Sequence, residues 1–338
     1  MKFKLTKKIK TAVLIILGIL CLVLVWEIFV PKSFTPKEPV VYNAESGLGQ
    51  AEIANDLESQ GVIKNSFFFK LYSFISGNAG RLQAGIYDFS PSMSIAGIVN
   101  RLAKGDVMKN RVVVLEGWDI DDIAKYVGAK KFYFKDEFIK ATKADYSDEF
   151  SFLKNRPKGA GLEGYIFPDT YSVPAHIMPH DFIKTALANF DKRLTPKLRA
   201  EIAKQKKTIF QIVTMASILE KEVPSLADKK IVAGILWKRI NSGMALQVDS
   251  TINYITGKSD SRATLADLKI DSKYNTYKYL GLPAGPISNP GMESILAAIY
   301  PTKSQYWFYL SADGTGETVY SRTFKDHKVA ISKYLREQ

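Results

Sequence analysis

The chain has 338 residues, 46% of them hydrophobic and 12% aromatic, a composition typical of folded globular domains with sizeable cores and long enough for two of them. Its net charge is +13. A single cysteine, Cys21, excludes disulfide bonds within the chain, and the three histidines are scattered, so we expect no metal site and no cofactor (His176, His180 and His327).

The first 30 residues combine a basic tip with a long apolar run. Residues 1–10 carry five lysines, and residues 11–30 are apolar except for Glu27. Twenty apolar residues are about the length that crosses a bilayer core as a helix. We therefore predict a transmembrane anchor at 11–30. The positive-inside rule places residues 1–10 in the cytoplasm, so the protein would be single-pass in the cell inner membrane with its remaining domains extracytoplasmic.

A cleavable signal peptide is the alternative to an anchor. Its apolar core would be shorter and would end in small residues. Here the run ends with residues 26–31, WEIFVP, which contain no A-x-A-like site, and bulky Leu20 before Cys21 makes a poor lipobox. The residues favour an uncleaved anchor, followed by a short stalk at 31–37.

The net positive charge indicates which kinds of molecule the chain could bind. The tip supplies five of the thirteen charges, so the rest of the chain is also basic. Outside the membrane, nucleic acid is a poor candidate partner, and anionic lipid headgroups and anionic wall polymers are better ones. The alternative is a solvated basic surface that aids solubility.

Between residues 40 and 127 a strand–turn–helix pattern occurs three times. The β-like segments are 39–42, 84–89 and 111–115, and each leads to an apolar anchor with an isoleucine five residues later. The residue after each anchor is an acceptable helix N-cap (Gly49, Ser94 and Asp119). Uneven spacing argues against a solenoid. The units predict a small α+β region that resembles the LysM-like fold, which binds glycan; plain α+β packing is the alternative.

A second domain is expected from residue 159 onward. Residues 129–160 are charged and without clean periodicity, which indicates a helical connector, so the first region spans 31–158 and the second 159–338. The second opens with GLEGYIFPDTY at 161–171, dense in glycine, aromatics and acids. Tyr165 and Asp169 in this segment suit sugar binding, because rings stack on sugar C–H faces and carboxylates accept hydroxyl hydrogens. An ordered turn beside a core is the alternative.

Residues 208–223, TIFQIVTMASILEKEV, predict a helix that is apolar almost all round and ends in two glutamates. Such a helix is usually buried, and a buried carboxyl that stays neutral near pH 7 can act as a general acid. At about 100° per residue, Glu220 and Glu222 lie on nearly opposite faces. We therefore expect one of them, and not both, to face a given cleft.

The remaining second-domain elements follow from local signals. Residues 180–190, 196–205, 229–241, 250–255, 292–299 and 324–335 predict helices, with Asp249 and Asn289 as candidate N-caps for the fourth and fifth. Thr323 would cap the last helix. Residues 306–310 and 318–321 flank the turn DGTG and predict a hairpin.

Five segments together resemble the YceG-like family, the MltG endolytic murein transglycosylases. They are GYIFPDTY at 164–171, ASILEKE at 216–222, LQVD at 246–249, YNTY at 274–277 and GLP…NPG at 281–291. Their order and spacing, the N-terminal anchor and the LysM-like region all agree with the family. The resemblance implies an α+β protein with a mixed α/β catalytic domain after the anchor and the LysM-like region.

The resemblance implies a lyase without cofactor that acts on peptidoglycan. Such an enzyme cuts the β-1,4 bond between N-acetylmuramic acid and N-acetylglucosamine in nascent glycan strands, ending their elongation. The muramoyl C6 hydroxyl closes on C1 and leaves a 1,6-anhydro end. Because no water attacks, one glutamate suffices as acid and then base, whereas ordinary glycosidases need two carboxylates. The family also implies work beside peptidoglycan synthases, although no motif here names one.

Helical phase does not choose between the two glutamates, but the resemblance places the acid on Glu222, with Glu220 the alternative. Glu220 would then be structural, paired with Lys221 or Lys229. Other lytic transglycosylases follow the acid with a small hydroxyl residue; this chain has Val223 instead. Candidates to hold the sugar or orient the acid, or else to serve as loop scaffolding, are Gln247, Asp249, Tyr274, Asn275 and Thr276.

Two other functions remain open. A non-catalytic, membrane-anchored scaffold could hold peptidoglycan near a synthesis complex with the LysM-like region. A hydrolase could use Asp249 as a second carboxylate beside Glu222, which requires the two carboxyls to lie ~5–10 Å apart.

Overall fold

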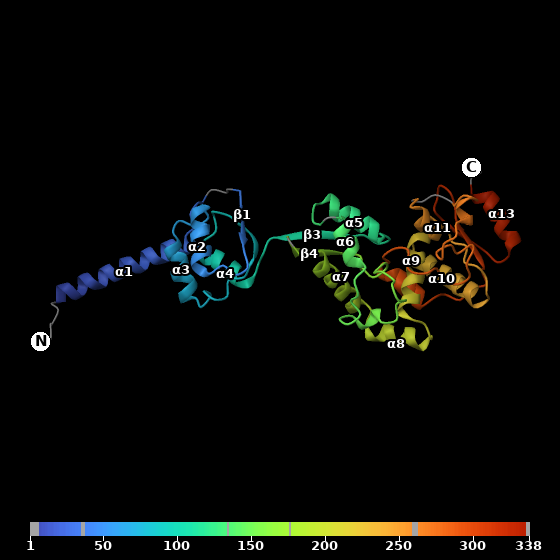
Figure 1. Ribbon diagram of the computed structural model, residues 1–338, viewed down its shortest axis with the longest axis horizontal. Coiled ribbons are helices and arrows are strands. Elements are labelled where there is room, and N and C mark those ends of the chain that lie inside the picture. Colours follow the sequence, from blue (N-terminus) through green and yellow to red (C-terminus); the bar gives the residue numbers. More distant parts are fainter. Residues whose placement is uncertain (1–6, 35–37, 134, 176, 259–262, 336–338) are drawn as a thin grey trace. The chain divides into compact units, whose positions relative to one another are not determined.

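The structure is a computed structural model that describes residues 7–34, 38–133, 135–175, 177–258 and 263–335 (Figure 1). Residues 1–6 of the basic tip, residues 35–37 of the stalk and His176 lie outside the described residues. The described part is a mixture of helices and three small two-stranded sheets. The chain divides into two compact units, one up to Asn110 together with Ser172–His176 and the other with Arg111–Tyr171 and Ile177 onward.

Helix α1, Lys7–Phe29, matches the predicted apolar run. It is the one helix of the described residues that is long and apolar enough to cross a membrane, judged by length and composition. Its leucine, isoleucine and valine side chains are exposed along most of its length, and Ile28 near its end is buried. An apolar surface of this extent is what a membrane-spanning helix presents to lipid.

The first unit continues with β1 (Val40–Ala44), α2 (Gln50–Ser59), α3 (Ser66–Ile75), β2 (Gly85–Phe89) and α4 (Ile95–Lys104). Strands β1 and β2 are antiparallel, with Val40 opposite Phe89 and Ala44 opposite Gly85. Tyr42, Tyr87 and Phe89 are buried in the core between this sheet and the helices. Helices α2 and α4 begin where the sequence predicts, after Gly49 and after Ser94, whose side chain caps α4. The Asn65 side chain caps α3.

The third strand–turn–helix is β3 (Lys109–Val114) followed by α5 (Ile120–Ala129), which Asp119 caps with a capping box. Strand β3 pairs with β4 (Asp169–Pro174), a strand that the sequence does not predict. The boundary of the units falls between Asn110 and Arg111, earlier than the boundary near residue 159 expected from sequence. The expected connector contains α6 (Lys135–Thr142) and a short 3-10 helix, Ser151–Leu153.

Helix α9, Ile209–Glu222, lies at the centre of the second unit, in contact with α8, α10, α11 and α12. Thr208 and Gln211 form a capping box at its start, and it ends at Glu222 because Val223 is extended. All eight residues from Ile212 to Leu219 are buried, as the apolar pattern predicts. The helices around it are α7 (Pro179–Arg193), α8 (Pro196–Lys204), α10 (Leu226–Asn241), α11 (Asp249–Thr256), the 3-10 helix Asp267–Lys269 and α12 (Met292–Ile299).

The C-terminal part of the unit is the predicted hairpin and its final helix. Strands β5 (Phe308–Ser311) and β6 (Thr318–Ser321) are antiparallel, with Phe308 opposite Ser321. Thr323 caps α13 (Phe324–Tyr334) through its side chain, as predicted.

Two predicted helix caps are wrong. Asp249 is the first residue of α11, whose N-cap is Val248, and its carboxylate accepts a hydrogen bond from Tyr277 instead. Asn289 does not cap α12, whose N-cap is Gly291; its side chain bonds to other segments. In both cases a longer-range partner takes the polar side chain that the local pattern assigned to the helix end.

We expect Gly234→Ala to lower the free energy of unfolding by about 1–3 kcal/mol, because the new Cβ would overlap the Thr302 carbonyl oxygen. Gly128→Ala is the matched control in another helix, where the nearest atom would lie 3.8 Å away. That change should leave stability unchanged or raise it by up to about 1 kcal/mol. Urea unfolding of both variants measures the difference, and equal effects would contradict the close packing of α10.

Candidate active site

The two glutamates at the end of α9 have different surroundings. Glu220 forms a buried ion pair with Lys229, whose Nζ lies 2.9 Å from Glu220 Oε1. Its Oε2 accepts a hydrogen bond of 2.7 Å from the Gly291 N–H. The side chains of Glu220 and Lys229 are 8% and 4% exposed. Both carboxylate oxygens are therefore in use, and Glu220 joins α9 to α10 and to the start of α12. Lys229, rather than Lys221, is its partner.

Glu222 faces a different set of groups. The Tyr309 hydroxyl, on β5, donates to Glu222 Oε2 at 2.9 Å. The backbone N–H of Ser250, in the first turn of α11, favours the charged form of the same carboxyl. Glu222 therefore sits where the C-terminus of α9 meets the N-terminus of α11 and strand β5.

Burial raises the pKa of the Glu222 carboxyl, and the negative charge of Asp249 acts in the same direction. The hydrogen bonds from Ser250 and Tyr309 act in the opposite direction but do not cancel the effect of burial. A carboxyl with a raised pKa keeps its proton to higher pH than an exposed glutamate. This is the property that a general acid needs.

Asp249 belongs to the same cluster. The Tyr277 hydroxyl donates to Asp249 Oδ1, and burial together with Asp249 and Glu222 raises the pKa of Tyr277. The pKa of Tyr309 also lies well above its usual value because the ring is buried beside Glu222. Both tyrosines therefore remain neutral donors at physiological pH. We name Glu222, Asp249, Ser250, Tyr277 and Tyr309 the acid cluster.

Arg239 fixes the frame of the acid cluster. Its guanidinium donates to the Leu246 carbonyl at 2.6 Å and to the Trp307 carbonyl at 2.7 and 2.9 Å. It is 5% exposed, and its charge lies near Tyr277 and Tyr309. One buried side chain thus holds both the loop before α11 and the start of the β5 hairpin.

Thr276 and Asn275 are buried and hold loops. The Thr276 hydroxyl accepts from the Val248 N–H at 3.1 Å and lies 3.0 Å from the Thr251 hydroxyl, so it positions the start of α11. The Asn275 side chain donates to the Leu268 and Ile270 carbonyls. Among the hydrogen bonds of the described residues, these two predicted residues make none to Glu222; they hold in place the loops that lead to the acid cluster.

Gln247 differs from them, because its side chain is exposed and its backbone is left-handed, with φ +52°. A non-glycine residue in this conformation carries strain, which is common at functional sites. Its N–H donates to the Thr276 carbonyl at 3.1 Å. Gln247 therefore lies two residues before Asp249 in the chain, with its amide side chain exposed to solvent.

Glu163 is the centre of a second cluster. It accepts hydrogen bonds from the Ile120 N–H, at 3.1 Å, and from the Asn289 amide, at 3.2 Å. Burial raises the pKa of Glu163 to about 8. Asn289 also donates to the Trp118 carbonyl and accepts from the Ile166 N–H, so this cluster ties three chain segments together.

Tyr274, predicted to hold sugar, lies with this second cluster. Its ring packs against Tyr254 with centroids 5.1 Å apart, and the Tyr254 hydroxyl donates to Glu163 at 3.5 Å. Tyr274 is half-buried. One face of the Tyr274 ring packs against Tyr254, and the exposed part of the ring is available to a sugar.

Tyr165 and Asp169 have other partners. Tyr165 is fully buried, packed against Phe152 and Phe190, so it offers no exposed ring to a sugar in this structure. Asp169 accepts from Asn189 and pairs with Arg193, both on α7. The ring of Tyr165 and the carboxylate of Asp169 are therefore both engaged by other residues of the same unit.

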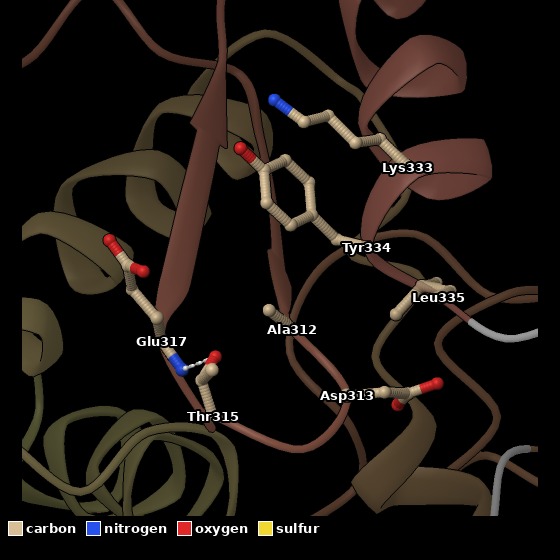
Figure 2. A pocket seen from close by; sticks show the side chains of 7 residues that line it. All are labelled: Ala312, Asp313, Thr315, Glu317, Lys333, Tyr334 and Leu335. Atoms are coloured by element: carbon tan, nitrogen blue, oxygen red, sulfur yellow. Dashed lines mark hydrogen bonds between the residues drawn. The ribbon is translucent and has the colours of Figure 1, made fainter.

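A pocket of about 260 Å³ lies at the β5–β6 hairpin, between Glu317 and the C-terminal end of α13, and no residue of the acid cluster lines it (Figure 2). Its wall includes Lys333 and Tyr334, and the Asp313 N–H donates to the Tyr334 carbonyl at 3.0 Å. Among the described residues, no group of three or more His, Cys, Asp or Glu side chains is arranged to hold a metal ion.

Three members of the acid cluster were not predicted from sequence. Tyr309 lies 87 residues from Glu222 along the chain, and its strand pattern indicates only a hairpin. Tyr277 is the last residue of the YNTY motif, in which the sequence pointed to the other three polar residues. Ser250 was assigned to a helix start, which is correct, but no local signal says that this start faces Glu222.

A family model described as the YceG-like family matches residues 43–333. The chain belongs to the YceG-like family. A structure of a yceG-like protein from Listeria monocytogenes has 32% sequence identity and a TM-score of 0.60, covering 87% of this chain and 99% of that one.

Curated relatives of this YceG-like chain carry the name endolytic murein transglycosylase. One from Bacillus subtilis is 33% identical over 318 residues, 90% of this chain and 87% of its own length. One from Streptococcus pneumoniae is 30% identical over 335 residues, 91% of this chain and 60% of its own length. The chain is therefore similar to nearly all of the first relative and to about three fifths of the second.

We expect Lys229→Ala to lower the free energy of unfolding by about 3–5 kcal/mol, because it leaves the buried Glu220 carboxylate without its cation. Lys221→Ala is the matched control, because Lys221 is the exposed neighbour of Glu220 and should matter by less than about 0.5 kcal/mol. Chemical denaturation compares the two. Similar losses would show that the Glu220–Lys229 pair does not secure the end of α9.

Proposed function

We propose that this chain is an endolytic murein transglycosylase that cleaves the β-1,4 bond between N-acetylmuramic acid and N-acetylglucosamine in nascent strands and so ends their elongation. The names of the relatives in Bacillus subtilis and Streptococcus pneumoniae support this activity. The observation that carries the mechanism is the environment of Glu222, a carboxyl with a raised pKa held by two donors at the end of a buried helix.

In this reaction Glu222 starts protonated and gives its proton to the glycosidic oxygen as the bond from that oxygen to C1 breaks. The C6 hydroxyl oxygen of the muramoyl sugar bonds to C1, and its proton passes to the Glu222 carboxylate. Glu222 ends as it began, and the product has a 1,6-anhydro end. Tyr309 and Ser250 stabilise the carboxylate that exists between the two proton transfers.

Asp249 has an electrostatic and positioning role in this proposal. Its negative charge raises the pKa of Glu222, which helps the acid hold its proton, and Tyr277 holds its carboxylate. Its charge can also stabilise positive charge that develops at C1 in the transition state. Gln247 and Tyr274, with exposed side-chain surface, are the proposed sugar contacts among the predicted residues.

The proposal includes the location. Helix α1 would be the single-pass anchor in the inner membrane, with a cytoplasmic N-terminus and both compact units outside the cytoplasm. There the substrate strands are made, and peptidoglycan synthases are the expected neighbours. The order β1–α2–α3–β2 with an antiparallel strand pair supports a LysM-like glycan-holding role for the first unit.

Glu222→Gln should reduce the release of 1,6-anhydro fragments from purified murein by at least about 100-fold, because the amide cannot donate an acidic proton. Mass spectrometry of the digest measures it. Glu220→Gln, the matched comparison, should lower stability and cost much less activity than Glu222→Gln, because its amide oxygen can keep the hydrogen bond from the Gly291 N–H although the ion pair is lost. Reducing-end products from the wild type would show a hydrolase, and a Glu222→Gln protein that still complements a deletion would favour a scaffold.

Tyr309→Phe should move the high-pH limb of the activity profile to higher pH. The enzyme needs protonated Glu222, so activity falls as pH rises through the pKa of that carboxyl. The Tyr309 hydroxyl stabilises the carboxylate and lowers this pKa, so its removal raises it. Tyr320→Phe is the matched control, because Tyr320 lies on the same hairpin but its hydroxyl donates to Asp228 on α10 and not to Glu222. A shift to lower pH, or equal shifts in both variants, would contradict the assignment of Glu222.

A further inference from the structure

Helix α3 presents an apolar face that no part of the described chain covers. Phe67, Phe74 and Ile75 are 58%, 75% and 69% exposed, whereas Phe69 and Ser73 on the opposite face are fully buried in the core. Phe67 and Phe74 are seven residues apart, so they lie on one side of the helix. Large aromatic side chains gathered in this way mark a contact surface rather than ordinary solvent-exposed surface.

The end of α1 packs beside this helix. The Phe29 and Tyr72 rings meet edge to face with centroids 5.8 Å apart, and Ile28 is buried. The link continues after α1, because Lys32 Nζ donates to the Gly61 carbonyl at 2.9 Å and the Ser33 N–H to the Pro91 carbonyl at 3.0 Å. The first unit is therefore joined to the end of α1 by packing and hydrogen bonds as well as by the chain.

The length of α1 sets the depth of this contact. Its 23 residues make a helix about 34 Å long, and a bilayer hydrocarbon core is about 30 Å thick. If α1 spans the membrane, Phe29 and the α3 ring that touches it lie at the headgroup boundary. Trp26, which is exposed near this end of α1, is of the residue type that collects at that boundary.

We propose that α3 lies in the headgroup region of the bilayer beside α1, with Phe67, Phe74 and Ile75 inserted among the lipids, as a second membrane contact of the first unit. This inference rests on the proposed anchor. Lys70 lies between the two phenylalanines on the same side of the helix, and Lys64 is exposed just before it. Apolar rings interleaved with lysines suit an anionic lipid surface, where rings insert and ammonium groups meet headgroups.

A second copy of the chain is the competing occupant of this face, and the lipid is favoured by continuity with α1. A protein partner would have to fit between α3 and the bilayer that α1 enters. The lipid is already there. Two membrane contacts would also hold the unit at a constant height and tilt relative to the membrane surface, which a single helix and stalk would not.

The test uses the full-length protein in vesicles of phosphatidylethanolamine and phosphatidylglycerol, with one nitroxide label at a time. Native Cys21 reports on the anchor. Phe74→Cys, in a Cys21→Ser background, reports on the α3 face, and Val41→Cys in that background is the matched control at an exposed apolar position on β1. Accessibility to oxygen and to a nickel complex gives the depth, because oxygen concentrates in lipid and the nickel complex in water.

We expect an oxygen-to-nickel accessibility ratio at position 74 that is severalfold higher than at position 41, with position 21 deeper still. A ratio at 74 equal to that at 41, with 21 deep, would overturn the inference and leave the anchor intact. A label at 74 that is shielded from both reagents would show a protein partner and also overturn it. An aqueous label at 21 would overturn the anchor itself and this inference with it.

Discussion

The buried ion pair between Glu220 and Lys229 is the interaction on which the geometry of the candidate site depends. Neither ion could be buried alone without a large cost in free energy, so the two must stay together. Because Glu220 also accepts from the Gly291 N–H, the pair holds the last turn of α9 against α10 and α12. Residues two apart on a helix point in nearly opposite directions. Fixing Glu220 toward α10 therefore directs Glu222 toward α11 and β5.

Much of the fold could be predicted because its signals are local. The three strand–turn–helix units, the helix of α9 and the β5–β6 hairpin were each predicted from residues within one element and its caps. Ser94, Asp119, Thr208 and Thr323 cap their helices through side chains that each accept from the N–H three residues further along the chain. Such a cap depends only on residues within one helix end, so it can be read from the sequence without knowing the tertiary contacts.

What could not be predicted depends on contacts between distant segments. The pairing of β4 with β3, the hydrogen bond from Tyr309 to Glu222 and the three side-chain hydrogen bonds of Asn289 all join residues far apart in the chain. Asn289 shows the cause of the error most clearly. An asparagine before a proline is a good local cap, but the Asn289 side chain accepts a buried hydrogen bond from the Ile166 N–H, and leaving that N–H unpaired would cost more than losing a cap.

The absence of a hydroxyl residue after Glu222 has a structural counterpart. Val223 is 2% exposed and extended, and its apolar side chain offers the carboxyl no hydrogen bond. The support comes instead from α11, whose first turn brings the Ser250 N–H to the carboxyl, and from Tyr309. A helix N-terminus favours a negative charge, so it stabilises the carboxylate without a neighbouring side chain. The same stabilisation lowers the pKa of Glu222, and burial with the Asp249 charge opposes it. The acid strength of Glu222 is thus a balance set by α11, β5 and Arg239, which holds both of them, and not by the residues on either side of it in the sequence.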